Sequence, residues 1–139
     1  MIYLLDDDPG FLQAVAQAVA PIGPAHATTL WSELAPKLIR EAKGQAEFDV
    51  LVCDLEMPGI NGLAFCDIVR RYNASLPIVL FSGAVERVPD GGPLTAKVDK
   101  RSGAAGLRGV LTELRDAWLA GRDGSGGHDR PAAPSRRTG

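Results

Sequence analysis

The stretch VLVCDLEMPGING, residues 50–62, decides the fold of this protein. Its first four residues are apolar, a run that is typical of a strand buried on both faces of a sheet. Asp54 follows this run directly, and the Pro- and Gly-containing segment 57–62 predicts a loop. Asn61 is placed to cap a helix over residues 62–73. The stretch therefore predicts a strand, a loop and a helix, with a carboxylate at the carboxyl end of the strand.

Similar units lie on both sides of this stretch, because strand patterns alternate with helical patterns along residues 1–120. We expect strands near residues 2–6, 25–30, 48–54, 76–83 and 95–100, and helices near residues 9–20, 31–44, 62–73 and 102–120. The connections between them are short, which favours a parallel sheet covered by helices on both faces, the α/β class. In such sheets, functional sites lie beyond the carboxyl ends of the strands.

The first strand is followed by three consecutive aspartates. Asp8 precedes Pro9, and this pair is typical of a helix N-cap followed by a first-turn proline. We therefore expect Asp8 to cap the first helix, which leaves Asp6 and Asp7 at the end of the strand.

Composition and charge limit the kinds of protein that this chain can be. Its 139 residues are 45% hydrophobic and carry a formal net charge of −2, which gives no general attraction to nucleic acid or anionic membranes. No apolar run is long enough to span a bilayer, and no basic segment precedes the first apolar run, so we expect a soluble cytoplasmic protein. Residues 1–120 are the expected domain. The Gly-, Pro- and Arg-rich residues 121–139 are expected to be a disordered tail or a linker stub.

The two cysteines, Cys53 and Cys66, fall in an apolar strand pattern and in a helical pattern. Both histidines are far from either cysteine in sequence, whereas a zinc site needs closely spaced Cys and His pairs. We expect two reduced, buried thiols.

Polar residues stand at the expected carboxyl ends of four strands: Asp6 with Asp7, Asp54, Ser82 and Lys100. In a parallel sheet these ends meet at one edge. Three carboxylates repel one another unless a cation is bound or one of them keeps a proton. Mg²⁺ fits this donor set, since it favours one or two carboxylates, waters and a phosphate oxygen. A carboxylate beside Mg²⁺ can attack a phosphoryl group, while Lys100 neutralises one phosphoryl oxygen and Ser82 donates a hydrogen bond to another.

Four stretches taken together resemble one known family, the receiver (response regulator, CheY-like) domains of two-component signal transduction systems. They are LLDDDP, VLVCDLEMPGINGL, PIVLFSGA and VDKRSGAAGL, in this order and at these separations. The resemblance covers about residues 1–120. It implies a flavodoxin-like, doubly wound sheet of five parallel strands in the order 2-1-3-4-5.

The resemblance also implies roles for the residues at the strand ends. Asp54 matches the phospho-acceptor, and Mg²⁺ (or Mn²⁺) would be held by Asp6, Asp7, Asp54 and the backbone carbonyl of Glu56. Asp7 matches the direct ligand, and Asp6 acts more through a bound water. Ser82 matches the switch hydroxyl and Lys100 the phosphate-binding lysine, for which Lys97 is the rival. The loops next to the site contain Met57, Pro58, Gly59, Gly83 and Ala84.

Three departures from the family pattern affect the expected signalling. Arg101 follows Lys100 where the family usually has proline, and Lys97 stands where an aromatic residue usually reports phosphorylation. Residues 83–99 contain VPDGGP, which leaves room for about one helical turn near Val85, so we expect a shortened or missing fourth helix. These departures predict a non-standard readout. Asp67 and Asp99 are expected to be solvated surface charges.

The leading interpretation is a receiver that takes a phosphoryl group from a sensor histidine kinase or a histidine phosphotransfer protein onto Asp54. It would catalyse only its own phosphorylation and dephosphorylation, and it would signal to a downstream protein partner without direct DNA binding within this chain. Two alternatives stay open: a receiver domain excised from a larger hybrid kinase or regulator, and an unphosphorylated pseudo-receiver that acts as an interaction module. A haloacid-dehalogenase-like phosphatase is disfavoured, because its nucleophile normally ends the first strand in an Asp-x-Asp motif, and DLE follows the third.

Overall fold

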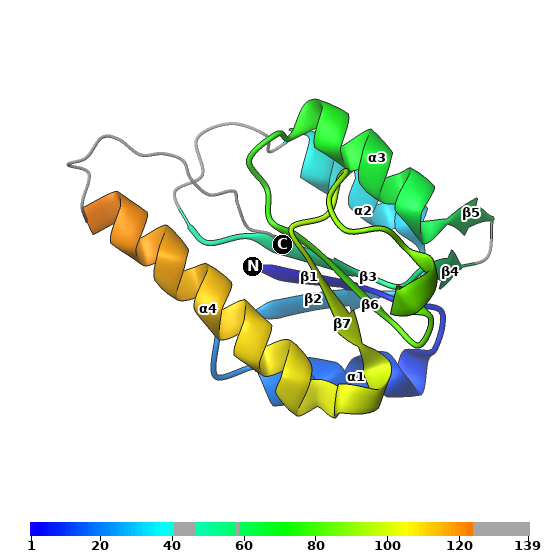
Figure 1. Cartoon of the computed structure of the whole chain (residues 1–139), viewed down its shortest axis with the longest axis horizontal. Helices are drawn as coiled ribbons and strands as arrows, with labels where there is room; N and C mark the ends of the chain where they lie inside the picture. The colour runs from blue at the N-terminus through cyan, green and yellow to red at the C-terminus, as the bar shows by residue number, and fades with distance from the viewer. Residues whose placement is uncertain (41–46, 58, 124–139) are drawn as a thin grey trace.

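A central sheet of five parallel strands organises the protein, as the computed structural model of the chain shows (Figure 1). The structure describes residues 1–40, 47–57 and 59–123. The strands are β1 (Ile2–Leu5), β2 (Ala25–Thr28), β3 (Val50–Cys53), β6 (Ile78–Ser82) and β7 (Ala96–Asp99), in the order β2-β1-β3-β6-β7. This is the order 2-1-3-4-5 of the main strands, so the predicted flavodoxin-like fold is confirmed.

Two pairs of helices cover the two faces of the sheet. The helices α1 (Pro9–Val19) and α4 (Gly103–Asp123) lie on one face, and α2 (Trp31–Arg40) and α3 (Gly62–Tyr72) lie on the other. A short antiparallel hairpin of β4 (Glu56–Met57) and β5 (Ile60–Asn61) precedes α3.

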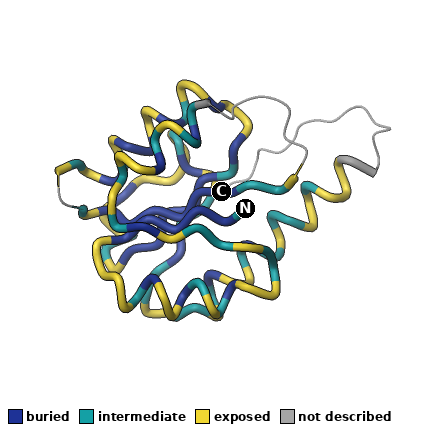
Figure 2. Tube along the Cα trace, turned by 180° about the vertical axis from the view of Figure 1, so that it is seen from behind, coloured by how far each residue is buried: buried dark blue, intermediate teal, exposed yellow. Residues whose placement is uncertain are grey.

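Each strand sends alternate side chains to the two helical layers, as the pleat of a strand requires. Leu5, Leu51 and Leu80 pack toward α2 and α3. Their sequence neighbours Leu4 and Val52 pack toward α1 and α4. Figure 2 shows the result, a sheet whose central strands β1, β3 and β6 are buried between helices whose outer faces are exposed. The unbroken apolar runs of the sequence are therefore explained by burial on both faces.

The predicted helix caps of α1 and α3 are both present. The Asp8 carboxylate accepts a hydrogen bond from the backbone N–H of Phe11, at 3.2 Å, and Pro9 is the first residue of α1. The Asn61 side-chain oxygen accepts hydrogen bonds from the N–H groups of Leu63 and Ala64, at 2.8 and 3.3 Å. Both helices therefore begin at fixed residues directly after the loops that carry the polar strand ends.

The segment between β6 and β7 contains a single 3₁₀ turn, η1 (Val85–Arg87), where a fourth helix was expected to be short or missing. Gly91 and Gly92 then take positive φ angles of 88° and 62°, a conformation that favours glycine. The VPDGGP sequence thus ends the turn early, and the prediction of a reduced fourth helix is confirmed.

The last helix continues beyond the predicted end of the domain. Its final residue is Asp123, so residues 121–123, assigned to the tail from the sequence, are helical. The rest of the predicted tail, residues 124–139, lies outside the described residues. Within the described ranges, no helix has both the length and the apolar character needed to cross a bilayer.

Candidate functional site

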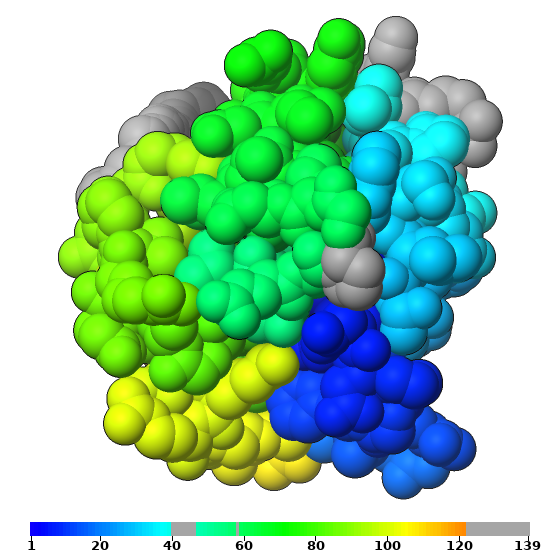
Figure 3. Space-filling model, turned by 90° about the vertical axis from the view of Figure 1, so that its right-hand side faces the viewer, coloured from blue at the N-terminus to red at the C-terminus, as the bar shows by residue number. Residues whose placement is uncertain are grey.

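The strand register brings the first two acidic positions side by side. Leu5 of β1 pairs with Cys53 of β3, so Asp6 and Asp54 leave neighbouring strands at the same level. The N–H of Asp54 donates to the carbonyl of Leu5 at 3.0 Å. Figure 3 looks onto this edge, where residues just after β1 meet the β4–β5 hairpin, the η1 segment and the start of α4.

Three carboxylates form a cluster at this edge. Oxygen atoms of Asp6, Asp7 and Asp54 all lie within 4.8 Å of one another. Asp6 and Asp54 are only 4% and 8% exposed, whereas Asp7 is exposed to solvent. The Lys100 ammonium lies 2.7 Å from Oδ2 of Asp6 and 3.5 Å from Oδ2 of Asp54. One lysine therefore offsets part of the repulsion among the carboxylates.

One oxygen of each buried carboxylate accepts a hydrogen bond from the backbone, which leaves the other oxygen to contact side chains or a ligand. Oδ1 of Asp6 accepts a hydrogen bond from the N–H of Asp8 at 3.1 Å, and Oδ1 of Asp54 accepts one from the N–H of Leu55 at 2.8 Å. In both residues the other oxygen, Oδ2, faces Lys100. The bond to Leu55 thus holds the Asp54 carboxylate in one orientation, with Oδ2 turned toward Lys100.

Gly62 allows the start of α3 to lie directly against the backbone of Asp54. A Cβ atom on Gly62 would sit 1.8 Å from the carbonyl oxygen of Asp54, far inside van der Waals contact. The N–H of Gly62 also donates to the carbonyl of Leu55 at 2.6 Å. Glycine is therefore required at position 62 because any side chain would overlap the Asp54 backbone. The neighbouring residues in the sequence do not indicate this contact.

Burial and like charge perturb the ionisation of the site. Burial raises the pKa of Asp54 above its ordinary value, Asp6 raises it further, and the Lys100 charge with the Leu55 hydrogen bond only partly opposes this. For Lys100, burial by itself lowers the pKa, but the hydrogen bonds and charges of Asp6 and Asp54 outweigh burial and raise it. The protonated form of the lysine is therefore favoured, while the ionised form of Asp54 is less favourable than that of a solvent-exposed aspartate.

Replacing Asp54 by asparagine is expected to raise the free energy of unfolding of the metal-free protein at neutral pH. A carboxyl whose pKa is raised binds its proton more tightly in the folded state, so its contribution to stability falls as pH rises above about 4, the unfolded value. Thermal unfolding in EDTA, measured from about pH 4 to neutral pH, should show the stability of Asp54→Asn increasing relative to that of wild type as pH rises. The exposed Asp67→Asn serves as control, and a gap that does not depend on pH would contradict the prediction.

The carboxylate cluster fits a small divalent cation. Mg²⁺ holds oxygen ligands at about 2.1 Å in an octahedron, so neighbouring ligands lie about 3 Å apart and opposite ligands about 4.2 Å apart. Oxygens within 4.8 Å of one another can meet this spacing with small side-chain movements, or with one carboxylate acting through water. Asp7, the exposed member, is open to a hydrated ion arriving from solvent.

Ser82 ends β6 as a buried hydroxyl, 4% exposed. Its Oγ accepts a hydrogen bond from the N–H of Ala84 at 3.1 Å, which shapes the turn into η1. Ser82 pairs in register with Asp99 of β7, the residue before Lys100. The hydroxyl and the lysine therefore leave adjacent strands at the same edge as the carboxylates.

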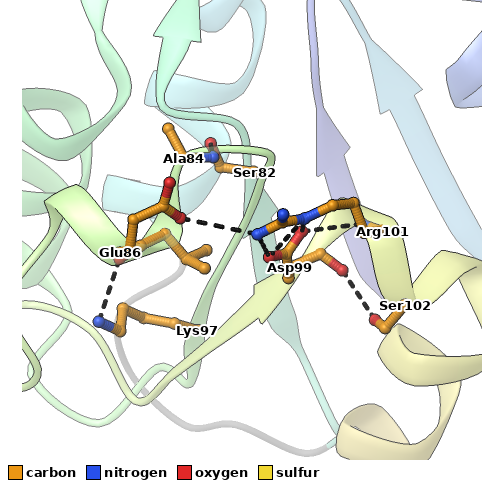
Figure 4. Close-up of polar contacts among 8 residues, drawn as sticks. Ser82, Ala84, Glu86, Lys97, Asp99, Arg101 and Ser102 are labelled. Atoms are coloured by element: carbon orange, nitrogen blue, oxygen red, sulfur yellow. Dashed lines mark hydrogen bonds and ion pairs between the residues drawn. The ribbon is translucent and has the colours of Figure 1, made fainter.

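Lys97, the rival for the lysine role, does not contact the carboxylate cluster. Its ammonium donates to the backbone carbonyls of Val85 and Val88 and pairs with Asp90 at 3.0 Å, and the side chain is 20% exposed. Figure 4 shows the Lys97 ammonium directed toward the η1 segment. It thus ties β7 to the η1 turn from the position where the family has an aromatic residue. Of the two lysines, the structure places only Lys100 against Asp6 and Asp54.

Arg101, which stands in the usual proline position, closes the loop after β7 by polar contacts (Figure 4). The Asp99 carboxylate accepts from both the backbone N–H and the guanidinium of Arg101, which lowers the pKa of Asp99 to about 2. Asp99 thereby caps the 3₁₀ turn η2 (Lys100–Ser102), so its prediction as a plain solvated charge was wrong. No peptide bond in the described ranges is cis. Arg101 also reaches Glu86 of η1 at 3.9 Å.

The remaining predicted positions lie around this edge. Met57 lies in the hairpin strand β4, and Gly59 has a φ of +84°. Gly83 has no neighbour that would crowd a Cβ atom, and Pro58 lies outside the described residues. The exposed Glu56 side chain pairs with Arg87 of η1 at 3.1 Å, and the role of its carbonyl stays a prediction.

Comparisons with known proteins place this geometry in context. A family model described as "Response regulator receiver domain" matches residues 2–91. TrrA from Thermotoga maritima, solved in complex with Mg²⁺-BeF, is 21% identical, with a TM-score of 0.69 over 81% of this chain and 96% of that chain. A CheY-like receiver domain protein from Methanospirillum hungatei is 15% identical, with a TM-score of 0.67 over 85% and 94% of the two chains. No curated protein matches the chain.

A further similar structure is that of the histidine kinase ThkA in complex with TrrA. The matching chain is 21% identical, with a TM-score of 0.67 over 81% of this chain and 96% of that chain. At these identities the similarity shows a shared fold.

Proposed function

Because this chain belongs to the response regulator receiver domain family of two-component systems, we propose that Asp54 accepts a phosphoryl group in a Mg²⁺-dependent reaction. The donor would be a phosphohistidine of a sensor histidine kinase or of a histidine phosphotransfer protein. The observation that carries the proposal is the cluster of Asp6, Asp7 and Asp54, with the Lys100 ammonium against Asp6 and Asp54. The only chemistry proposed for the chain is its own phosphorylation and dephosphorylation, in the cytoplasm.

The transfer step uses the oxygen of Asp54 that has no backbone partner. Oδ2 attacks the phosphorus, the P–N bond of the phosphohistidine breaks, and the imidazole leaves with the bonding electron pair. The product is an acyl phosphate on Asp54. The bond from the N–H of Leu55 to Oδ1 holds the carboxylate in line during this step.

The metal would be held by Asp6, Asp7, Asp54 and the backbone carbonyl of Glu56. Mg²⁺, or Mn²⁺ with the same oxygen preference, supplies neutralisation of the phosphoryl oxygens. Lys100 is expected to move from its two carboxylate partners to a phosphoryl oxygen. Ser82 would rotate its hydroxyl from the turn toward the phosphoryl group, with the N–H groups of Gly83 and Ala84 nearby.

Readout would pass through the η1 turn and not through an aromatic side chain. When Ser82 engages a phosphoryl group, its bond to the N–H of Ala84 is lost, and the turn that begins at Val85 is free to shift. Lys97 carries this shift to β7, since it holds the carbonyls at both ends of the turn. A downstream protein partner would sense the new arrangement.

Two structures of one similar protein support the proposal with what that protein binds. TrrA was solved with Mg²⁺ and a beryllium fluoride and also in complex with the histidine kinase ThkA. Both complexes are consistent with a metal-dependent phosphoryl site and a kinase partner for this chain.

Incubation with a small acyl phosphate and Mg²⁺, followed by mass spectrometry of the intact protein, tests the proposal. Wild type should gain one phosphoryl group, EDTA should prevent the gain, and Asp54→Asn should lose it. Asp67→Asn, an exposed carboxylate on α3, should label like wild type. Equal labelling of Asp54→Asn would overturn the assignment, and a wild type that neither labels nor binds Mg²⁺ would identify a pseudo-receiver.

A further inference from the structure

We propose that Phe11 is a positioning residue that holds the Lys100 ammonium at the phosphoryl site through the face of its aromatic ring. The inference rests on the proposed function, because Lys100 is the group that would bind the phosphoryl oxygen. The Lys100 Nζ atom lies 4.6 Å from the centroid of the Phe11 ring, within the range of a cation–π contact.

The ring is held from two sides. Phe11 belongs to the first turn of α1, and its N–H donates to the capping carboxylate of Asp8. On the sheet side, the ring stacks on Phe81 of β6, with centroids 5.6 Å apart and planes inclined by 30°. Phe81 directly precedes Ser82. The ring is therefore fixed between the helix that follows the metal-binding aspartates and the strand that carries the switch hydroxyl.

The three partners of Lys100 differ in what they do to its charge. Asp6 and Asp54 attract the ammonium by neutralising it, and both are also the proposed ligands of the metal. The ring attracts the ammonium without neutralising it. When the carboxylates turn to the metal, the ring remains the partner that keeps Lys100 at the edge with its charge available to a phosphoryl oxygen.

The ring also borders the same small cavity as two of the carboxylates. Asp6, Asp54, Phe11 and Phe81 all line this cavity. A shorter aliphatic side chain at position 11 would enlarge the cavity beneath the carboxylates and remove the surface on which the ammonium rests. A purely structural role of Phe11 predicts the same damage whether or not Lys100 is present, and this difference can be measured.

A double-mutant cycle separates the two roles. Binding of beryllofluoride, a phosphoryl mimic, is measured in the presence of Mg²⁺ for wild type, Phe11→Leu, Lys100→Met and the double variant, and binding of Mg²⁺ alone is measured for each. We expect Phe11→Leu to weaken mimic binding about five- to thirtyfold in the presence of Lys100. In the Lys100→Met background the same change should have less than about twofold effect, and in either background Phe11→Leu should change Mg²⁺ affinity by less than about twofold.

A control variant, a series of fluorinated residues and an NMR measurement complete the test. Phe48→Leu removes a partly buried ring that packs on Trp118, away from the site, and should leave mimic binding unchanged. Progressively fluorinated phenylalanines at position 11 keep the ring's shape while weakening its negative face, so mimic binding should fall stepwise. In the metal-free protein, the ε-methylene protons of Lys100 should show an upfield ring-current shift that Phe11→Leu abolishes.

Equal losses in both Lys100 backgrounds, or no loss on fluorination, would overturn the positioning role. If the proposed function is wrong, wild type itself will not bind the mimic, and this result can be told apart from a specific failure of the Phe11 inference. The Phe11 inference would then be overturned together with the proposed function.

Discussion

Gly62→Ala is expected to destabilise the protein by about 3 kcal/mol and to weaken Mg²⁺ binding. The new Cβ atom would lie 1.8 Å from the carbonyl oxygen of Asp54 and 2.9 Å from its carbonyl carbon. Both contacts are with backbone, so no flexible side chain can move aside. Either α3 must move away from the sheet or the Asp54 backbone must shift, and both changes disturb the carboxylate cluster.

Thermal unfolding and Mg²⁺ titration measure the two effects. A loss of about 3 kcal/mol corresponds to a fall in Tm of roughly 10 °C for a domain of this size. Gly109→Ala is the matched control, because Gly109 lies within α4 and nothing would approach its Cβ atom within 4 Å. That change should be neutral or stabilising by up to about 1 kcal/mol, since alanine favours helix. Equal stability of the two variants would refute the close-approach argument.

Lys100→Met should reduce binding of a phosphoryl mimic by up to about a hundredfold while leaving Mg²⁺ affinity equal to or above that of wild type. A hydrogen bond to a charged group contributes roughly 1.5–3 kcal/mol, and every 1.4 kcal/mol is a factor of ten. Mg²⁺ binding is spared because the ammonium competes with a cation for Asp6 and Asp54. Methionine keeps much of the side chain's length and apolar stem, so the change isolates the charge.

Lys97→Met is the matched control for this prediction. It removes the ammonium of another lysine, in β7, the strand that Lys100 directly follows, but one that contacts η1 and Asp90 and not the carboxylates. Calorimetric titration with beryllofluoride and Mg²⁺ should show Lys97→Met close to wild type. If Lys97→Met weakens the mimic as strongly as Lys100→Met, the assignment of Lys100 to the phosphoryl oxygen is wrong.

Much of the fold could be predicted because it depends on patterns that are local in the sequence. Unbroken apolar runs indicate strands buried on both faces, and Asp8 and Asn61 mark helix starts by their own side-chain chemistry. The reduced fourth helix could be predicted for the same reason, because the prolines and glycines of VPDGGP act on their own backbone.

Contacts between distant segments could not be predicted. The approach of Gly62 to Asp54 depends on the path of the whole hairpin, and the partners of Lys97 depend on how η1 turns. Phe11 lies in the first turn of α1, but its place in the sequence does not show that the ring meets Lys100. One local contact was also missed: Asp99 pairs with Arg101, two residues away, whereas a charge near a strand end was expected to be solvated.

The two cysteines make it possible to follow the separation of α3 from the sheet in the protein without any substitution. Cys53 precedes the acceptor aspartate in β3 and Cys66 lies in α3, and both thiols are fully buried and unpaired by a disulfide. An alkylating reagent can reach either one only when α3 separates from the sheet. The rate of thiol modification therefore reports the free energy of that separation, and any ligand that binds only the closed state must slow it in proportion to its occupancy.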